Sequence, residues 1–234
     1  QAVVIVATVR ALKMHGGVDK KELGTENLEA LAKGIKNLEK HIENIAKYNL
    51  PSVVAINAFP TDSEAELQLL KDTCNKMGVD VAISKVWEKG ADGGIELAEK
   101  LLEILDTKEA NYQPLYDLNL SIKEKIETIA KEIYGADGVA FDKKVLTKMK
   151  KYEAQGLADL PICVAKTQYS LSDQPTLLGR PRGFTIKIND LIPSAGAGFL
   201  VAISGSIMRM PGLPKRPAAV NMDIDKDGKI VGLF

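Results

Sequence analysis

The sequence predicts an α/β fold, in which βαβ units form a parallel sheet, followed by an α+β subdomain. Two observations lead to this prediction. As far as about residue 112, apolar runs of strand length alternate with longer helical patterns, and such alternation is typical of parallel sheets with right-handed crossovers. From about residue 113, helical segments give way to several strand-like runs separated by Gly, Pro and Ser.

The first predicted strand is a continuous apolar run at residues 1–9, in which Val3 to Val6 are all β-branched. A run of this kind is typical of a strand that is buried on both faces of a parallel sheet. A glycine loop at Gly16 and Gly17 is expected to follow it. Because the run has neither an initiator Met nor a polar lead-in, we expect the chain to be a piece of a longer protein.

A long amphipathic helix is expected next. Its apolar side chains recur at steps of three and four residues, which places them on one buried stripe: Leu28, Leu31, Ile35, Leu38, Ile42 and Ile45. Asn49 and Pro51 end this helix.

The alternation of strands and helices continues to residue 112. Residues 52–57 and 79–86 are predicted strands. Between them, Ser63 and Glu66 form a capping box that starts a helix. A further helix, with one apolar face, is expected at residues 95–105.

The second half of the chain has a different pattern. Ser121 and Glu124 predict a capped helix that runs to Tyr134, and a charged helix is expected at residues 143–153. The strands predicted after them are residues 161–166, 184–188, 199–204 and 218–224.

Composition favours a protein that acts on a small molecule. Thirty-one basic residues balance thirty-one acidic ones, so no overall field draws the chain onto nucleic acid or an anionic membrane, and neither is expected as a partner. No apolar run approaches the roughly 20 residues of a membrane span. Cys74 and Cys163 are too few for a disulfide scaffold, so a reducing cytoplasm is expected.

Three familiar ligand motifs find no support in the sequence. No GxxxxGK[ST] phosphate-binding loop occurs. His15 and His41 lie far apart with no cysteine near either, so no metal site is predicted. The tail at residues 223–228 starts like an EF-hand, but its twelfth position is Phe234 instead of Glu. A hairpin with a type I′ turn at the Asp-Gly pair is expected there.

One candidate ligand site is the segment VATVRALKMHGG at residues 6–17. The predicted strand delivers Arg10, Lys13 and His15 into a glycine loop, and loops at the carboxyl ends of parallel strands are where α/β proteins bind ligands. On spacing alone, a ligand-binding loop and a structural turn remain equally open.

A second candidate site is formed by two aromatic residues. Phe59 follows the strand that ends at Asn57, and Trp87 follows the strand predicted to end at Val86. If these strands are neighbours, both rings leave the same edge of the sheet and could hold a flat ligand between them by stacking. Ordinary core packing of both rings is the alternative.

Several long segments carry a resemblance to one family. VATVRALKMHGG closely resembles a signature segment of the formate tetrahydrofolate ligases, also called formyltetrahydrofolate synthetases. The following segments resemble that family in the expected order: INAFPTDSEAE at 56–66, KVWEKGADGG at 85–94, AKTQYSLSDQP at 165–175 and MRMPGLPKRPAA at 208–219. The resemblance covers essentially the whole chain.

The resemblance implies a reaction and a set of partners. In this family ATP, carrying Mg, phosphorylates formate, and N10 of tetrahydrofolate attacks the formyl phosphate to give 10-formyltetrahydrofolate. The family has a larger N-terminal portion with the phosphate-binding loop and the basic residues that handle formyl phosphate, so the catalytic residues are expected there and this chain alone is expected to be inactive. Family members are homotetramers.

Site residues follow by the same resemblance. Phe59 and Trp87 match the aromatic pair that stacks on the folate, and Pro60 looks like an apolar wall of that pocket. Ile83 would be a second wall residue and stands where the family has a leucine, and Asn57 could offer an amide to the ligand. Arg10, Lys13 and His15 would lie toward the nucleotide.

The resemblance also implies three regions. Residues 1–49 would complete the N-terminal nucleotide-binding domain, 50–112 would be a small α/β folate-binding domain and 113–234 a C-terminal α+β domain. Region 1–49 would then lack packing partners for its strand and its long helix. Two other functions remain open: a non-catalytic folate-binding or assembly module, and the synthetase part of a multifunctional one-carbon enzyme.

Overall fold

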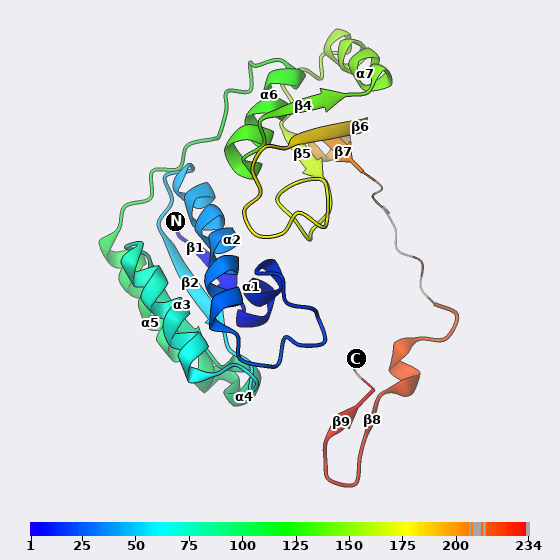
Figure 1. Cartoon of the computed structure of the whole chain (residues 1–234). Coiled ribbons are helices and arrows are strands. Elements are labelled where there is room, and N and C mark those ends of the chain that lie inside the picture. The colour runs from blue at the N-terminus through cyan, green and yellow to red at the C-terminus, as the bar shows by residue number, and fades with distance from the viewer. Residues whose placement is uncertain (206, 208–211, 213, 233–234) are drawn as a thin grey trace.

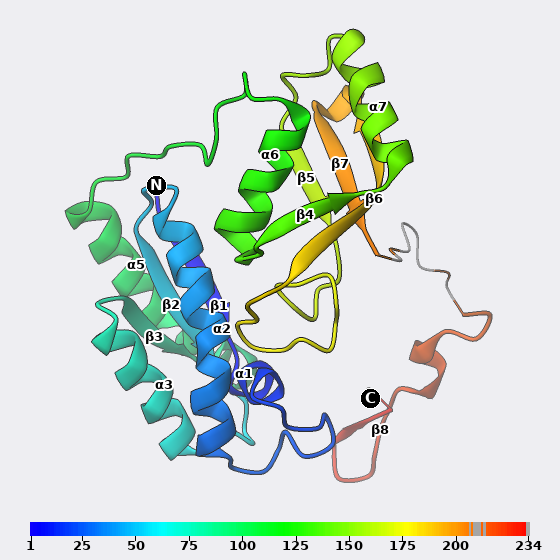
Figure 2. The same cartoon turned by 45° about the horizontal axis from the view of Figure 1, so that its top comes forward.

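The computed structural model describes residues 1–205, 207, 212 and 214–232. The chain forms two bodies, each built around its own sheet, and a hairpin near the C-terminus (Figures 1 and 2). We call residues 1–107 the N-terminal body and residues 121–205 the second body. The extended segment at residues 108–120 joins them.

The N-terminal body contains a parallel sheet with the strand order β1-β2-β3. Its strands are β1 (Val3–Ala7), β2 (Ser52–Asn57) and β3 (Asp80–Ser84), and each pairs with the next in parallel. The predicted α/β fold with parallel βαβ units is confirmed. The predicted domain boundary between residues 49 and 50 separates β1 from β2 along the chain, although these two strands are hydrogen-bonded in one sheet. The division into two domains at this point stays a prediction.

Helices cover the two faces of this sheet unequally. On one face, α2 (Leu28–Ala46) and α3 (Glu64–Lys76) share a hydrophobic core with β2 and β3. On the other face, α5 (Ile95–Thr107) packs against β2 and β3. Figure 2 shows α2 in front of the strands and α5 behind them.

The outer face of β1 is left exposed, which differs from the sequence prediction. Val4 is 37% exposed and Val6 66%, although both were expected to be buried. The physical reason is that α5 covers β2 and β3 and stops short of the edge strand. The apolar stripe of α2, which was expected to lack partners, is instead packed on the sheet through Leu31, Ile35 and Leu38.

A short helix, α1 (Val9–His15), stands where a loop was predicted after the first strand. Thr8 caps it by accepting a hydrogen bond from the Ala11 N–H at 3.1 Å, and the residues that follow are good helix formers. Two glycines let α1 and α2 touch. A Cβ on Gly16 would lie 1.9 Å from the Ala30 carbonyl oxygen, and one on Gly34 only 1.7 Å from that of Leu12.

The strand predicted at residues 79–86 also ends earlier than expected. After Ser84 the chain turns into the one-turn helix α4 (Val86–Lys89) and a 3₁₀ turn at Gly90–Gly94. Gly93 folds back on the strand end and accepts a hydrogen bond from the Lys85 N–H at 2.9 Å. A Cβ at Gly93 would lie 2.3 Å from the Lys85 carbonyl oxygen, so this turn requires glycine.

The second body is an α+β unit with a mixed sheet of order β4-β6-β7-β5. Strands β4 and β6 are parallel, β6 and β7 antiparallel, and β5 and β7 parallel. Its elements are α6 (Ile122–Ile129) with a π turn at Ala130–Tyr134, β4 (Gly138–Phe141), α7 (Lys143–Ala154), β5 (Ile162–Ala165), β6 (Thr185–Ser194), a 3₁₀ turn at Ala195–Ala197 and β7 (Phe199–Ser204). The predicted helices and three of the predicted strands are confirmed, whereas β4 was not predicted.

The C-terminal hairpin differs from its prediction in two details. A 3₁₀ turn at Ala218–Asn221 replaces most of the expected strand, and only β8 (Asp223–Ile224) and β9 (Ile230–Val231) pair. Gly228 has a φ of +77° but Asp227 does not have a positive φ, so the turn is not type I′. The Asp225 side chain instead holds the turn by accepting from the N–H groups of Asp227 and Lys229. Phe234 lies outside the described residues.

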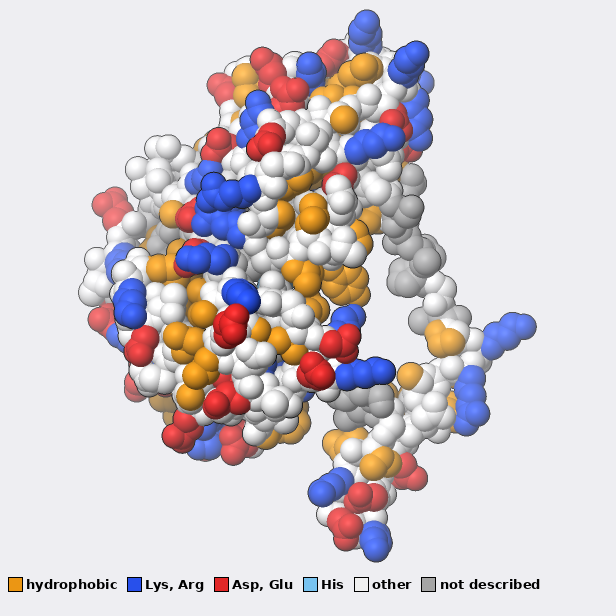
Figure 3. All heavy atoms as spheres, in the orientation of Figure 1, with side chains coloured by type: hydrophobic (Ala, Val, Ile, Leu, Met, Phe, Trp, Pro, Cys, Tyr) orange, Lys and Arg blue, Asp and Glu red, His pale blue; other side chains and the backbone are white. Residues whose placement is uncertain are grey.

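Charged side chains of both signs are interspersed over the face shown in Figure 3, in keeping with the formal net charge of +0. None of the described helices combines the length and apolar character that a membrane span needs. Within the described residues, no three His, Cys, Asp or Glu side chains come together as metal ligands.

Candidate functional site

The predicted aromatic pair leaves one edge of the N-terminal sheet. Strands β2 and β3 are parallel neighbours, with Asn57 in register with Ser84, so their carboxyl ends meet at the same edge. Phe59 follows β2 after one residue, and the Ala58 N–H donates to the Ser84 carbonyl oxygen at 3.0 Å. Trp87 lies on α4, just beyond the end of β3. The predicted aromatic site required β2 and β3 to be neighbouring strands, and they are.

The side chains at this edge differ in exposure. The Trp87 ring is 68% exposed, so it does not serve the core packing that was the alternative reading. Phe59 is half-buried, as are Ile83 on β3 and Asn57 on β2, whereas Pro60 is exposed. Among the described residues the stacked aromatic pair is Tyr48 with Tyr112, so the rings of Phe59 and Trp87 are not stacked on one another. Trp87 is therefore open to solvent.

The turn after β2 is held by a carboxylate. One oxygen of Asp62, Oδ2, accepts a hydrogen bond from the Phe59 N–H at 2.8 Å, and the Asp62 N–H donates to the Phe59 carbonyl oxygen at 2.9 Å. Ser63 then caps α3, and the predicted capping box with Glu66 is confirmed. These contacts fix the backbone on which Phe59 and Pro60 stand.

Lys13 lies in a buried ion pair and not in a ligand loop. Its side chain is fully buried, its ammonium is 2.8 Å from Glu66 Oε1, and it also donates to the Thr25 carbonyl oxygen at 2.9 Å. Glu66 accepts further hydrogen bonds from the N–H groups of Asn27 and Ser63. Burial acts to raise the pKa of Glu66, but these hydrogen bonds, led by that of Lys13, hold it below its ordinary value. The pair ties α1 to α3.

Arg10 and His15 are placed differently from Lys13. Arg10 is half-buried near the end of β1. His15 faces the second body, where its Nδ1 accepts a hydrogen bond from the Gly179 N–H at 3.1 Å. Burial and the neighbouring His41 lower the pKa of His15, which keeps it neutral and able to accept. The three residues of the first candidate site are thus brought onto one short helix but do not converge on a single point.

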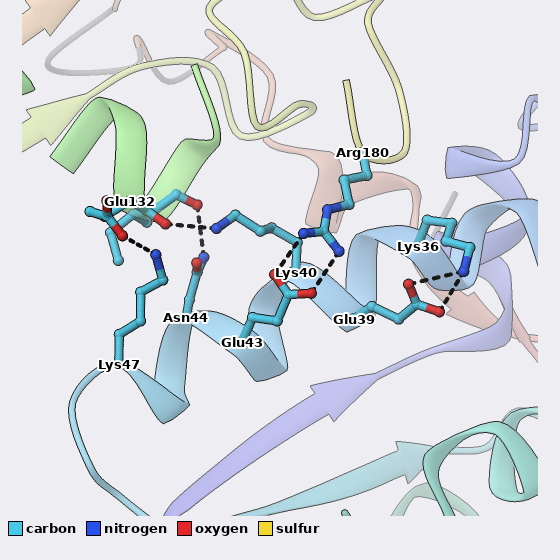
Figure 4. Close-up of polar contacts among 9 residues, drawn as sticks. Lys36, Glu39, Lys40, Glu43, Asn44, Lys47, Glu132 and Arg180 are labelled. Carbon is cyan, nitrogen blue, oxygen red and sulfur yellow. Dashed lines mark hydrogen bonds and ion pairs between the residues drawn. The ribbon is translucent and has the colours of Figure 1, made fainter. Parts of the chain in front are cut away.

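A polar face of α2 joins the two bodies (Figure 4). The amide of Asn37 donates to the Gly179 carbonyl oxygen at 2.9 Å, and that of Asn44 to the Ile133 carbonyl oxygen at 2.9 Å. Between them, Lys40 donates to the Glu132 carbonyl oxygen at 2.6 Å. At the margin, Glu43 accepts two hydrogen bonds from Arg180, at 2.7 and 2.6 Å. This polar face was not recognised from the sequence, although its spacing repeats that of the apolar stripe.

A cavity of about 250 Å³ lies where the two bodies meet. Its lining includes His15, Asn37, His41, Tyr134, Lys166 and Gln168. The Lys166 ammonium donates to the carbonyl oxygens of Thr167, Ser170 and Ser172 and lies 4.8 Å from the centre of the Tyr134 ring. Burial lowers the pKa of Lys166 to about 8. With all three of its donors used, Lys166 organises its own loop.

The whole chain matches a known protein family. The family model described as "Formate--tetrahydrofolate ligase" matches residues 1–234, the whole chain. Of the segments on which the resemblance rested, those at residues 6–17, 56–66, 85–94 and 165–175 lie within the described residues, and the one at 208–219 lies partly outside them.

Proposed function

Because this chain belongs to the formate–tetrahydrofolate ligase family, we propose that it supplies the folate pocket of an ATP-dependent ligase that forms 10-formyltetrahydrofolate. The observation that carries the proposal is the shared edge of β2 and β3, from which Phe59 and the 68% exposed Trp87 both emerge. An exposed tryptophan at the same sheet edge as a second aromatic residue favours binding of a flat, conjugated ligand. The pteridine and aminobenzoyl rings of tetrahydrofolate are ligands of that kind.

In the proposed pocket, Phe59 and Trp87 stack on the folate while Pro60 and Ile83 supply apolar walls. Asn57, at the end of β2, offers an amide to the polar edge of the ligand. Stacking on one aromatic ring contributes about 1–3 kcal/mol, by analogy with nucleic-acid bases. Two rings would therefore contribute a large part of the affinity of a micromolar ligand, whose free energy of binding is about 8 kcal/mol.

We propose that the reaction proceeds through formyl phosphate. A formate oxygen attacks the γ-phosphorus of ATP and releases ADP. N10 of tetrahydrofolate then attacks the formyl carbon, the bond from that carbon to the phosphate oxygen breaks, and N10 loses its proton. The part of this chain is to bind and orient the folate so that N10 lies against the formyl carbon, since positioning alone can supply several kcal/mol of the barrier reduction.

On the nucleotide side, we propose Arg10 as the residue of α1 that faces the remainder of the enzyme. His15 instead faces the second body of this chain, where it accepts from the Gly179 N–H. Lys13 is left out because its ammonium is committed to Glu66 and Thr25. Magnesium would arrive with ATP, held by the phosphates and by residues outside this chain. We assign no catalytic residue within residues 1–234.

The proposed partner is an N-terminal portion of the same enzyme, and its proposed docking surface is the open edge of β1 with the exposed Val4 and Val6. An uncovered strand edge with apolar side chains is a template for a further strand. In a non-catalytic folate-binding module that portion would be absent. We further propose that the intact enzyme assembles as a homotetramer.

Removal of the exposed Trp87 ring tests the proposed folate pocket. In the intact ligase, Trp87→Ala should weaken tetrahydrofolate binding roughly fivefold to a hundredfold and leave the ATP Michaelis constant nearly unchanged. Phe59→Ala should act in the same direction. Isothermal titration with tetrahydrofolate measures the effect. Because Trp87 is the only tryptophan of these 234 residues, its fluorescence in this chain should also fall when folate binds.

Tyr112→Ala is the matched control, since Tyr112 is an exposed aromatic residue, 61% accessible, in the segment that joins the two bodies. Its removal should leave folate affinity unchanged. A Trp87→Ala enzyme that kept its folate affinity, or that lost ATP affinity instead, would contradict the proposed pocket.

A further inference from the structure

A buried ion pair joins segments that meet at the carboxyl edge of the N-terminal sheet. The side chains of Lys13, on α1, and Glu66, on α3, are fully inaccessible to solvent, and the ammonium lies 2.8 Å from Oε1 of the carboxylate. Taking two charges out of water is costly, and apolar side chains in place of such a pair are often neutral or stabilising. The charges are therefore weak evidence for a role in stability, and the geometry that they impose is the more informative feature.

Hydrogen bonds around the pair give it one geometry. Lys13 also donates to the Thr25 carbonyl oxygen at 2.9 Å. Oε1 of Glu66 accepts from the Asn27 N–H at 2.9 Å, and Oε2 accepts from the Ser63 N–H at 3.1 Å. Both carboxylate oxygens are thus engaged, and neither side chain can turn without leaving a buried group unpaired. The pair therefore holds α1, the N-cap residue of α2 and the N-cap residue of α3 in one arrangement.

On one side, the pair borders the turn that carries Phe59. Asp62 exchanges two hydrogen bonds with the backbone of Phe59, and Ser63 follows directly. Glu66 holds Ser63 in two ways, because the Ser63 hydroxyl oxygen also accepts from the Glu66 N–H at 3.2 Å. A shift of Glu66 would therefore move the backbone on which Phe59 stands.

On the other side, the pair borders Arg10, which we propose for the nucleotide side. Arg10 lies three residues before Lys13 on the seven-residue helix α1, so the two side chains are about one turn apart. Burial, the larger effect, raises the pKa of Asp62, whereas the positive charges of Lys13 and Arg10 act to lower it. Arg10 is thus close to the turn that carries Phe59, and Lys13 fixes the rotation of the helix on which Arg10 stands.

We propose that Lys13 and Glu66 are positioning residues, which hold Arg10 at a fixed place relative to the Phe59 turn and so align formyl phosphate with the folate. The inference rests on the proposed function, because Phe59 must bind the folate and Arg10 must face the nucleotide side. The pair itself touches neither substrate, since both its side chains are fully buried. It should affect the chemical step, in which a misplacement of about 1 Å can cost about 100-fold in rate, far more than the binding of either substrate.

Two single variants and their double variant test the proposal in the intact ligase. Lys13→Met and Glu66→Gln should each lower the melting temperature, because each leaves the charge of the other residue buried and unpaired. The double variant buries neither charge and should recover most of that loss. Its single-turnover rate, measured by rapid quench, should nevertheless stay about tenfold to a hundredfold below that of the wild type, because no ion pair then ties α1 to α3. The tetrahydrofolate Kd and the ATP KM should change less than about threefold.

Lys125→Met is the matched control. Lys125 is also a fully buried lysine, and its ammonium donates to the carbonyl oxygens of Ala158 and Leu160 at 2.6 and 3.3 Å. It lies on α6 of the second body and takes no part in the Lys13–Glu66 arrangement. The substitution makes the same change in size and charge as Lys13→Met, so it should lower the melting temperature without changing the single-turnover rate. An equal loss of rate in this variant would show that lost stability alone slows the reaction, and would overturn the proposal.

A measurement on the wild-type enzyme covers the case in which the variants fail to fold. Because Glu66 accepts from the N–H groups of both Asn27 and Ser63, bound tetrahydrofolate should slow hydrogen exchange at Asn27 as well as at Ser63. The Asp137 N–H, which is hydrogen-bonded within the second body, should exchange at the same rate with and without folate. Exchange at Asn27 that does not respond to folate would contradict the proposal.

The outcomes separate this inference from the proposed function. If the double variant regains the wild-type single-turnover rate together with its stability, the pair is structural only, and the inference is overturned while the pocket stands. The same holds if the double variant loses folate or ATP affinity as much as it loses rate, because the pair would then serve binding. If Trp87→Ala leaves folate affinity unchanged, the pocket itself is wrong and the inference falls with it.

Discussion

The two faces of α2 hold the protein together by different physics. One face carries Leu31, Ile35 and Leu38, which are nearly inaccessible to solvent and pack on the sheet of the N-terminal body. The other face carries Asn37 and Asn44, which are almost as deeply buried but donate hydrogen bonds to backbone carbonyl groups of the second body. The same helix is thus part of a hydrophobic core on one side and of a polar interface on the other.

The difference lies in how strictly geometry is specified. Apolar burial is non-directional and contributes about 25 cal/mol per Å², so the apolar face tolerates small shifts of α2 on the sheet. Each amide of the polar face must meet a particular carbonyl oxygen. A hydrogen bond contributes only about 0.5–1.5 kcal/mol net, but an unpaired buried group costs about 1–3 kcal/mol. The apolar face should therefore dominate stability, and the polar face should fix the orientation of the second body.

The largest effect is expected from the apolar face. Leu31→Ala should lower the free energy of unfolding by about 2–5 kcal/mol, because Leu31 is fully buried and its truncation leaves a cavity against the sheet. Urea denaturation followed by circular dichroism measures it.

Leu28→Ala is the control on the same helix. Leu28 is 40% exposed although the sequence pattern placed it on the same stripe, and its truncation should cost well under half as much as that of Leu31. Equal losses for the two variants would mean that the helix, and not its packing on the sheet, carries the stability.

An intermediate effect is expected from the polar face. Asn37→Leu should cost about 1–3 kcal/mol, because it leaves the Gly179 carbonyl oxygen without its buried donor. Asn44→Leu should cost less, since it also removes the Asn44 Oδ1 atom that has no partner within the described residues. Hydrogen exchange should show faster exchange at the Gly179 N–H in Asn37→Leu than in Asn44→Leu. A larger loss for Asn44→Leu would contradict this account of the interface.

The contrast between the faces also explains how far the sequence could predict the fold. The apolar stripe of α2 recurs at helical spacing and could be identified directly, as could the capping box at Ser63 and Glu66. The polar face has the same spacing, but its partners are backbone carbonyl groups far along the chain. Backbone groups are the same in every residue, so the sequence pattern does not reveal which of them a side chain will contact. The exposure of Val4 and Val6 was missed for a similar reason, since it depends on how far α5 extends across the sheet.

At the candidate site, sequence reasoning identified residue types better than their environments. The shared edge of Phe59 and Trp87 followed from βαβ topology and was correctly anticipated. Lys13 was placed with Arg10 and His15 because all three follow one strand. A helix in place of a loop turned Lys13 inward onto Glu66, and spacing within a loop carries no information about that rotation. Asp62 lies within a segment that resembles the family, but its hydrogen bond with the Phe59 N–H could be identified only once the turn was known.

The smallest effect is expected at the margin of the polar face, where Arg180 and Glu43 form a bidentate ion pair. The arginine side chain is 24% exposed and the glutamate side chain 48%, and the hydrogen bonds from Arg180 lower the pKa of Glu43. Exposed pairs of this kind are worth about 0.2–1 kcal/mol. A double-mutant cycle with Arg180→Ala and Glu43→Ala should give a coupling energy within that range, measured by urea denaturation.

The Lys36–Glu39 pair is the control for the Arg180–Glu43 pair. Both of its residues lie on α2 (Figure 4), so it measures the effect of a surface ion pair that does not cross the interface. Its coupling energy should be about 0.3–0.5 kcal/mol. Both coupling energies should decrease as ionic strength rises from about 0.05 to 0.5 M, because dissolved ions screen the attraction between exposed charges. Only the loss of the Arg180 pair should also speed hydrogen exchange at Gly179, the residue next to Arg180 and the partner of Asn37. If neither pair affects Gly179, the Arg180–Glu43 pair does not help to fix the orientation of the second body.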